Sequence, residues 1–80
     1  MLVTTELLEK NGFKQTSPQK KLFLRESDGV LISFFGQDNV RVSFPWGPIS
    51  RSVITFETPT EDFKGICIFL RVFGKTPLHD

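Results

Sequence analysis

The chain is poor in the side chains on which most catalytic and metal sites depend. Its 80 residues include no tyrosine, and cysteine and histidine occur once each. A lone cysteine excludes an internal disulfide bond, and a metal site needs several cysteine, histidine or carboxylate ligands that converge. Cys67 stands among apolar residues, which is typical of a small buried side chain; a reactive thiol there would need a nearby base. His79 stands one residue from the end of the sequence, where we expect a mobile side chain and a poor catalyst.

The carboxylates and glycines also fall outside the patterns of catalytic sites. Residues 61–62 carry two carboxylates that suit the start of a helix, and Asp28 and Asp38 occupy predicted turns. Gly36 and Gly47 lack the strand-to-helix context of a phosphate-binding loop. We therefore expect no catalytic residues, no metal or cofactor site and no small-molecule substrate.

Neither sign of charge dominates, and long apolar runs are lacking. The chain has ten basic and nine acidic residues, for a net charge of +1. This balance argues against a dedicated binder of polyanions. No stretch approaches the roughly 20 apolar residues that span a bilayer, and no apolar run follows a basic start as in a signal peptide. We expect a cytoplasmic protein that does not enter membranes.

The length predicts one domain, residues 1–80, around one core. The apolar fraction of 39% is low for this length, but nine phenylalanines and one tryptophan supply large core-forming side chains. Chain entropy opposes folding by about 1.5 kcal/mol per residue, on the order of 120 kcal/mol in all. Such a fold is self-sufficient but marginal, and chains of this size gain stability by pairing with a copy of themselves.

Residues 58–74 carry the most complete helix signal in the sequence. Thr58 and Glu61 have the spacing of a capping box, and Pro59 suits the first helical position. Gly74 suits the left-handed residue that ends a helix. An apolar stripe at helical spacing lies between these signals and consists of Phe63, Ile66, Leu70 and Phe73. Because the apolar residues from 66 to 72 also alternate, a strand is the alternative structure.

Two apolar residues of this segment fall on its otherwise charged side. Ile68 and Val72 are one helical turn apart and lie beside Phe69. Exposed apolar residues in register begin a patch. We expect Ile68, Val72 and Phe69 to mediate self-association between copies related by a two-fold axis.

The remaining segments predict one more helix and four strands. Residues 4–11 have the start and stop signals of a short helix, and residues 15–19 form a polar loop. Strand-like runs cover residues 20–26, 30–35, 40–44 and 51–57. Because short turns separate these runs, we expect a four-stranded antiparallel meander with both helices on one face, an α+β fold in the order α-β-β-β-β-α. Residues 75–80 either add to a sheet edge or stay loose.

Alternation within the strands assigns side chains to two faces of the sheet. The face toward the helices would carry Leu22, Leu24, Val30, Ile32, Phe34, Val40, Val42, Phe44, Ile54 and Phe56. The opposite face would mix cations with aromatic rings: Lys21, Phe23, Arg25, Phe35, Arg41 and Arg51. Sheets that bind single-stranded nucleic acid combine stacking rings with cations, so this binding is the alternative function. Otherwise the face is a solvated surface or pairs with a second copy.

The segment after the third predicted strand holds the single tryptophan. Trp46 lies between Pro45 and Pro48, which restrict the backbone. Tryptophan is enriched at recognition surfaces, so Trp46 is a candidate for contact with a partner; the alternative is that it caps the edge of the core. Together these patterns predict a non-enzymatic accessory or protein-interaction module that forms a homodimer.

Two segments resemble parts of known small proteins. Residues 4–13, Thr-Thr-Glu-Leu-Leu-Glu-Lys-Asn-Gly-Phe, resemble the start of proteins found in phages and mobile elements of gut bacteria. Residues 69–74, Phe-Leu-Arg-Val-Phe-Gly, are similar to their close, an apolar helix with an arginine and a glycine. The resemblance implies an α+β fold and offers no catalytic residues to carry over. Residues 75–80 depart from the longer closing strand of those proteins, because Pro77 cannot donate in a strand ladder.

Overall fold

The computed structural model describes residues 1–17, 20–48 and 52–80, and within these ranges it has five strands and two helices. In chain order they are α1 (Thr5–Lys10), β1 (Lys14–Ser17), β2 (Lys20–Arg25), β3 (Val30–Phe35), β4 (Asn39–Trp46), β5 (Ser52–Pro59) and α2 (Phe63–Val72). The strands form one antiparallel sheet in which each strand pairs with the next. The predicted α+β meander is confirmed, but its sheet has five strands and not four.

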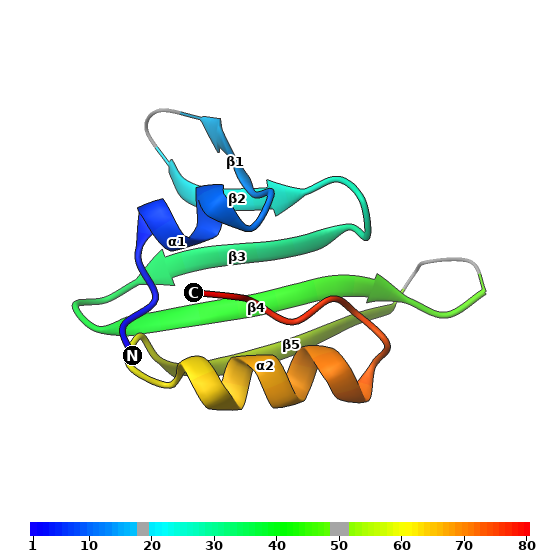
Figure 1. Cartoon of the computed structure of the whole chain (residues 1–80). Helices are drawn as coiled ribbons and strands as arrows, with labels where there is room; N and C mark the ends of the chain where they lie inside the picture. Colours follow the sequence, from blue (N-terminus) through cyan, green and yellow to red (C-terminus); the bar gives the residue numbers. More distant parts are fainter. Residues whose placement is uncertain (18–19, 49–51) are drawn as a thin grey trace.

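Both helices and the C-terminal segment cover the same face of the sheet, which we call the inner face (Figure 1). In this view α1 lies over the end of the sheet that contains β1 to β3, and α2 runs along β5. The last residues pass between the two helices. No described helix lies on the opposite, outer face, so the domain has the two-layer arrangement that its apolar alternation predicts.

The core lies between the sheet and this layer. Val30, Ile32, Val40, Val42 and Phe44 of β3 and β4 are fully buried, as their alternation predicts. From the helices they meet Leu7, Leu8, Ile66, Cys67 and Leu70, which are buried too. Cys67 is thus the small buried residue that its apolar neighbours indicate.

The first helix forms where its capping signals indicate. The Thr4 hydroxyl accepts a hydrogen bond from the Leu7 amide at 3.2 Å, as an N-cap side chain does. The chain leaves α1 at Asn11, and Gly12 has a φ of +87°, which glycine adopts without strain. Six residues of helix are not stable alone, so α1 depends on the burial of Leu7 and Leu8 against the sheet.

The polar segment predicted as a loop is partly a strand. β1 covers Lys14–Ser17 and pairs with β2, with an irregular register between Gln15 and Ser17. Three of its four residues are exposed. An edge strand is held by backbone hydrogen bonds on one side and needs no apolar side chains, so hydrophobic alternation cannot reveal it. Residues 18–19, the rest of the predicted loop, lie outside the described residues.

The predicted faces of β2 were wrong. Arg25 pairs with Val30, and Phe23 pairs with Ile32, so Phe23 and Arg25 lie on the inner face, where both are buried. Leu22 and Leu24 lie on the outer face instead. The cause is the length of the turn: residues 26–29 form a four-residue connection, closed by a 2.9 Å hydrogen bond from the Gly29 amide to the Arg25 carbonyl. A shift of one residue in register moves every side chain of a strand to the other face.

The predicted capping box of the second helix was also wrong. Thr58 and Pro59 belong to β5, opposite Val40 and Asn39, because the ladder with β4 keeps the chain extended as far as Pro59. The N-cap is Asp62, whose carboxylate accepts a hydrogen bond from the Gly65 amide at 3.0 Å. The helix itself, and not the alternative strand, is confirmed over Phe63–Val72.

The C-terminal end of α2 lies where the sequence predicts it, just before Gly74. Gly74 has a φ of +73°. Its amide donates to the Arg71 carbonyl at 3.1 Å, and the Lys75 amide donates to the Leu70 carbonyl at 2.8 Å. This is the pattern of a Schellman motif, and it turns the chain back over the inner face.

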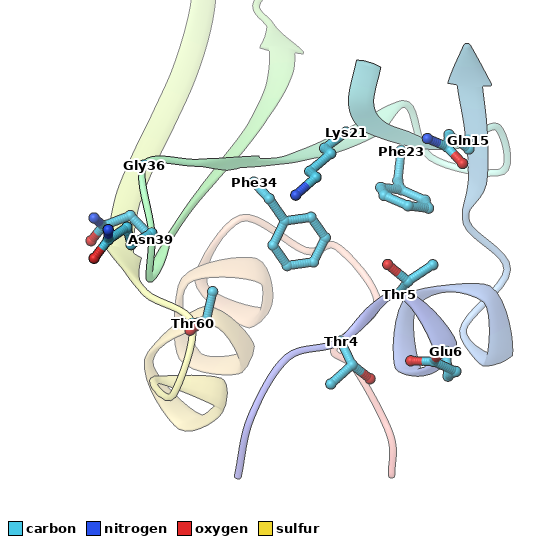
Figure 2. A pocket seen from close by; sticks show the side chains of 11 residues that line it. Thr4, Thr5, Glu6, Gln15, Lys21, Phe23, Phe34, Gly36, Asn39 and Thr60 are labelled. Atoms are coloured by element: carbon cyan, nitrogen blue, oxygen red, sulfur yellow. The ribbon is translucent and has the colours of Figure 1, made fainter. Parts of the chain in front are cut away.

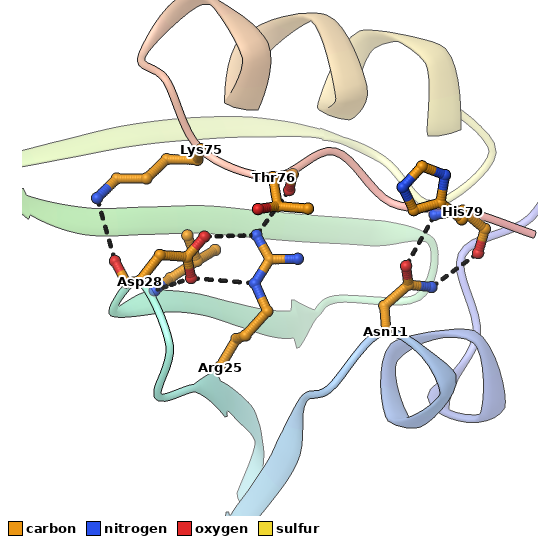
Figure 3. A network of polar contacts seen from close by, with 7 residues as sticks. Asn11, Arg25, Asp28, Lys75, Thr76 and His79 are labelled. Carbon is orange, nitrogen blue, oxygen red and sulfur yellow. Dashed lines mark hydrogen bonds and ion pairs between the residues drawn. The ribbon is translucent and has the colours of Figure 1, made fainter.

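The C-terminal segment, residues 75–80, neither extends the sheet nor stays loose. Leu78 is buried in the core, and its carbonyl lies 3.5 Å from the Cys67 sulfur. The Asn11 side chain exchanges two hydrogen bonds of 2.8 Å with the backbone of His79 (Figure 3). His79 is therefore held through its backbone, while the residue as a whole is exposed.

Candidate functional site

The exposed side of α2 divides into a charged part and an apolar part. At about 100° per residue, Ile68 lies on the crest of the helix, opposite the core. Gly65 and Val72 lie between this crest and Phe69, whereas Lys64 and Arg71 lie between the crest and Cys67. Ile68 is 50% exposed and Val72 is 72% exposed, as their place among charged residues predicts.

Contacts below the helix fix which way each part faces. Phe69 stacks on Phe56 of β5, with ring centroids 5.0 Å apart, whereas Cys67 contacts the C-terminal segment through Leu78. Gly65, Val72 and Phe69 therefore face the edge of the sheet formed by β5. The charged part faces the middle of the inner face.

A row of aromatic rings joins α2 to the sheet. Phe69 also packs on Phe44 at 5.6 Å, and Phe73 packs on Phe44 at 5.4 Å. Trp46 continues the row, with its ring 5.2 Å from Phe73 and 6.0 Å from Phe44. Phe69 is half-buried and anchored by these rings, so it belongs to the edge of the core as well as to the predicted patch.

Trp46 lies at the edge of the core, as one of the two alternatives predicts, and its contact with a partner stays a prediction. It is the last residue of β4, and its ring contacts place it at the rim of the core. It is also 44% exposed. A partly exposed tryptophan leaves a large apolar area that a partner could contact.

The free edge of β5 is a feature that the sequence analysis missed. Among the described strands, β5 pairs only with β4. The Thr60 amide donates to the Asp38 carbonyl at 2.8 Å, which places the even-numbered backbone groups of β5 toward β4 in an antiparallel ladder. The N–H and C=O groups of Val53, Thr55 and Glu57 then point away from the sheet. Pro59 fits this alternation, because it is an odd-numbered residue of β5 and proline occurs where a strand needs no donor.

The outer face of the sheet keeps only part of the predicted cation and ring cluster. Arg41 lies over the Phe35 ring, 4.9 Å from its centroid, and pairs with Glu57 at 3.4 Å. Lys21, Phe23 and Arg25 all lie on the inner face, because residues two positions apart in a strand share a face. Arg51 lies outside the described residues. The six residues therefore do not form one surface, because four residues, and not three, connect β2 to β3.

A cleft of about 420 Å³ opens at one end of the inner face (Figure 2). Phe23 and Phe34 form part of its lining, and Lys21 points its amino group into it. Thr4, Thr5, Glu6, Asn39 and Thr60 contribute polar groups to the lining. Lys21 and Glu6 bring one charge of each sign, so the described lining does not select a ligand by charge.

Arg25 is the centre of a polar network on the inner face (Figure 3). Arg25 is only 5% exposed, and its guanidinium lies over the Phe13 ring, 4.8 Å from the centroid. It donates to both carboxylate oxygens of Asp28, at 3.0 and 2.8 Å, and to the Thr76 carbonyl at 2.6 Å. The network joins the β2–β3 turn to the C-terminal segment and satisfies a charge that burial would otherwise penalise.

The same network lowers the pKa of the Asp28 carboxyl group. Partial burial raises the pKa of Asp28, but the hydrogen bonds and charge of Arg25 outweigh it, helped by backbone donors at Val30 and Thr76. The pKa of Asp28 therefore lies below its ordinary value of 3.8. Lys75 adds a hydrogen bond from its amino group to the Asp28 carbonyl at 3.1 Å. These groups have a full structural explanation as a clamp on the C-terminal segment.

Comparison of the chain with protein families, with curated proteins and with solved structures finds no match. The resemblance of residues 4–13 and 69–74 to phage and mobile-element proteins stays a prediction. Within residues 1–17, 20–48 and 52–80, no three His, Cys, Asp or Glu side chains gather as a metal site requires. In the same ranges no helix is long and apolar enough to cross a membrane.

Proposed function

We propose that this protein is a non-enzymatic protein-interaction module that works as a homodimer, with α2 in the interface. The observation that carries the proposal is the exposure of Ile68 and Val72 on a helix whose opposite side is already packed. Isolated apolar residues on a surface need no explanation, but these two lie next to the aromatic row that ends at Trp46. Exposed apolar residues that gather in one region of a surface mark interaction sites.

The size of the domain supports the same proposal. A chain of 80 residues buries a smaller fraction of its surface than a larger domain does, and closing an apolar surface against a copy adds burial without added length. The charged residues Lys64 and Arg71 would lie at the rim of the interface, where charge affects specificity and association rate more than affinity.

Sedimentation velocity over a range of protein concentrations tests the proposal. We expect a reversible dimer, and we expect Ile68→Glu and Val72→Lys to shift the protein toward a folded monomer. Lys64→Glu is the matched control, because it changes an exposed charge of the same helix at the rim of the interface, where charge has little effect on affinity; it should leave the dimer intact. A protein that stays monomeric at high concentration, or a dimer that none of these substitutions weakens, would contradict the proposal.

Nucleic-acid binding is the second function that the sequence predicts, and it has weaker support. Among the predicted residues that the structure describes, Phe35 and Arg41 alone keep the expected arrangement on the outer face. The Arg41 charge is already paired with Glu57, which reduces its attraction for a phosphate.

A further inference from the structure

The β5 edge and the α2 side that faces it form two layers of one surface. The backbone groups of Val53, Thr55 and Glu57 offer donors and acceptors that no other described strand pairs with, and another β-strand can satisfy them. Directly above, Gly65, Val72 and Phe69 offer a small and apolar helix surface. A strand edge beneath a bare helix side needs a partner that brings a strand in one layer and a helix in the other.

We propose that two copies of this chain join edge to edge through β5, so that their sheets become one continuous antiparallel sheet and their α2 helices pack side by side. The inference rests on the proposed dimer and specifies its geometry. A two-fold axis perpendicular to the sheet pairs β5 with β5 of the other copy in antiparallel fashion. It keeps both inner faces, and therefore both helices, on the same side.

The spacing of the two layers fits this arrangement. Phe69 contacts Phe44 on β4 and Phe56 on β5, so α2 lies above the space between these two strands. Neighbouring strands are about 4.8 Å apart. The axis of α2 is then about one strand spacing from the two-fold axis, and the two helices are about 10 Å apart. That separation is the normal distance between packed helices.

The centres of the two layers also coincide, as a single two-fold axis requires. The middle of β5 falls between Thr55 and Phe56, and the middle of α2 falls between Cys67 and Ile68. The stacked rings of Phe56 and Phe69 bring these two positions together. One axis can therefore relate the strands to each other and the helices to each other without leaving either layer unpaired.

The composition of the β5 edge suits a copy of itself. An unprotected edge strand invites aggregation, and proteins usually protect such edges with charges, prolines or bulges. Between Ser52 and Thr58 only Glu57 is charged, and proline comes only at Pro59, the end of the strand. The other edge strand, β1, is short and irregular and begins with a lysine. Closure of the β5 edge by a second copy makes such protection unnecessary.

The geometry assigns different roles to the residues of α2. Val72 lies on the side that faces the other helix, whereas Ile68 lies on the crest and only borders the contact. A dimer formed crest to crest would reverse this order.

Hydrogen exchange followed by NMR gives the decisive readout. In the dimer, the amide hydrogens of Val53, Thr55 and Glu57 should exchange at least about tenfold more slowly than in a sample diluted to monomer. The amides of Ile54 and Phe56, which donate toward β4, should be protected in both samples. A dimer in which the amides of Val53, Thr55 and Glu57 exchange as in the monomer would overturn the edge-to-edge arrangement and leave the proposed dimer in place.

Substitution at Thr55 provides an independent test. Thr55→Pro removes a donor that points away from β4, so the fold should survive, while the dissociation constant should rise about tenfold or more. Thr55→Val is the matched control, because it keeps the amide and should keep the dimer. Val72→Lys should weaken association more than Ile68→Glu. If Thr55→Pro dimerises like Thr55→Val, or if Ile68→Glu has the larger effect, the arrangement is wrong; a monomeric parent protein would exclude the proposed dimer as well.

Discussion

Arg25 and Asp28 form a two-point ion pair, with Nε to Oδ1 at 3.0 Å and Nη2 to Oδ2 at 2.8 Å. The pair lies at the end of β2, where the chain turns toward β3, and the same guanidinium reaches the Thr76 carbonyl. A charged side chain this deeply buried fixes the position of three separate parts of the chain. It is also one of the β2 residues that were predicted on the wrong face.

Removal of one member of this pair should be costly. We expect Arg25→Met to destabilise the fold by roughly 3 kcal/mol, the lower end of the range for a buried pair, because the Asp28 side chain keeps 17% exposure and can recover some water. Arg25→Lys should cost less, since it keeps the charge but loses the two-point geometry. Urea denaturation of the three proteins measures the difference. An effect of Arg25→Met below about 0.5 kcal/mol would mean that the pair is not formed.

The same pair predicts a dependence of stability on acid. Because the pKa of Asp28 is lower in the folded protein than its ordinary value of 3.8, the ionised carboxylate favours folding. This contribution is complete above about pH 4 and is lost as the pH falls through the folded pKa. We expect the free energy of unfolding of the parent protein to fall more steeply below pH 4 than that of Asp28→Asn. Parallel curves for the two proteins down to pH 2 would contradict this assignment.

Leu78 tests whether the C-terminal segment belongs to the core. It is almost fully buried, and truncation of such a leucine to alanine costs about 2–5 kcal/mol. We therefore expect Leu78→Ala to lower the free energy of unfolding by at least 2 kcal/mol, whereas Thr76→Ala, an exposed position that acts through its backbone carbonyl, should change it little. Equal and small effects at both positions would show that this segment is loosely attached.

Much of the fold follows from local signals in the sequence, and the errors have identifiable causes. Val40, Val42 and Phe44 alternate with polar residues, and Gly74 ends a helix, so these parts were predicted correctly. The faces of β2 were not, because Leu22, Phe23 and Leu24 are consecutive apolar residues, and alternation does not show which of them face the core. Only the length of the turn decides between them.

The candidate site was less accessible to sequence analysis than the fold. Ile68 and Val72 could be found, since apolar residues among charges are visible in a helical pattern. The free edge of β5 could not, because it depends on the order of strands in the sheet and not on residue type. The Arg25 network joins residues about 50 positions apart, and no local pattern contains such a contact.

Nucleic-acid binding can be tested on the residues that share the outer face. We expect no measurable binding of short single-stranded DNA or RNA at micromolar protein in low salt, because the six predicted residues do not form one surface. If binding does occur there, Arg41→Ala should reduce the slope of log affinity against log salt concentration by about the contribution of one phosphate contact. Phe35→Ala should weaken binding without changing this slope. Binding that Arg41→Ala weakens in this way would make nucleic-acid recognition the better function.

Gly65 offers a prediction in which two local effects oppose each other. Alanine is normally favoured over glycine in a helix by about 1 kcal/mol. At this position, however, a Cβ would collide with the carboxylate of Asp62. That carboxylate accepts hydrogen bonds from the Gly65 amide at 3.0 Å and from the Thr58 hydroxyl at 2.6 Å, and loss of an N-cap costs about 0.5–2 kcal/mol.

We therefore expect Gly65→Ala to leave the free energy of unfolding unchanged or to lower it by up to about 1 kcal/mol. In an Asp62→Ala background the cap is already absent, and the same substitution should stabilise the protein by up to about 1 kcal/mol. Urea denaturation of the four proteins, at one low concentration at which self-association does not contribute, completes a double-mutant cycle. The same effect of Gly65→Ala in both backgrounds would mean that Asp62 does not cap α2, and the helix would then have to begin elsewhere.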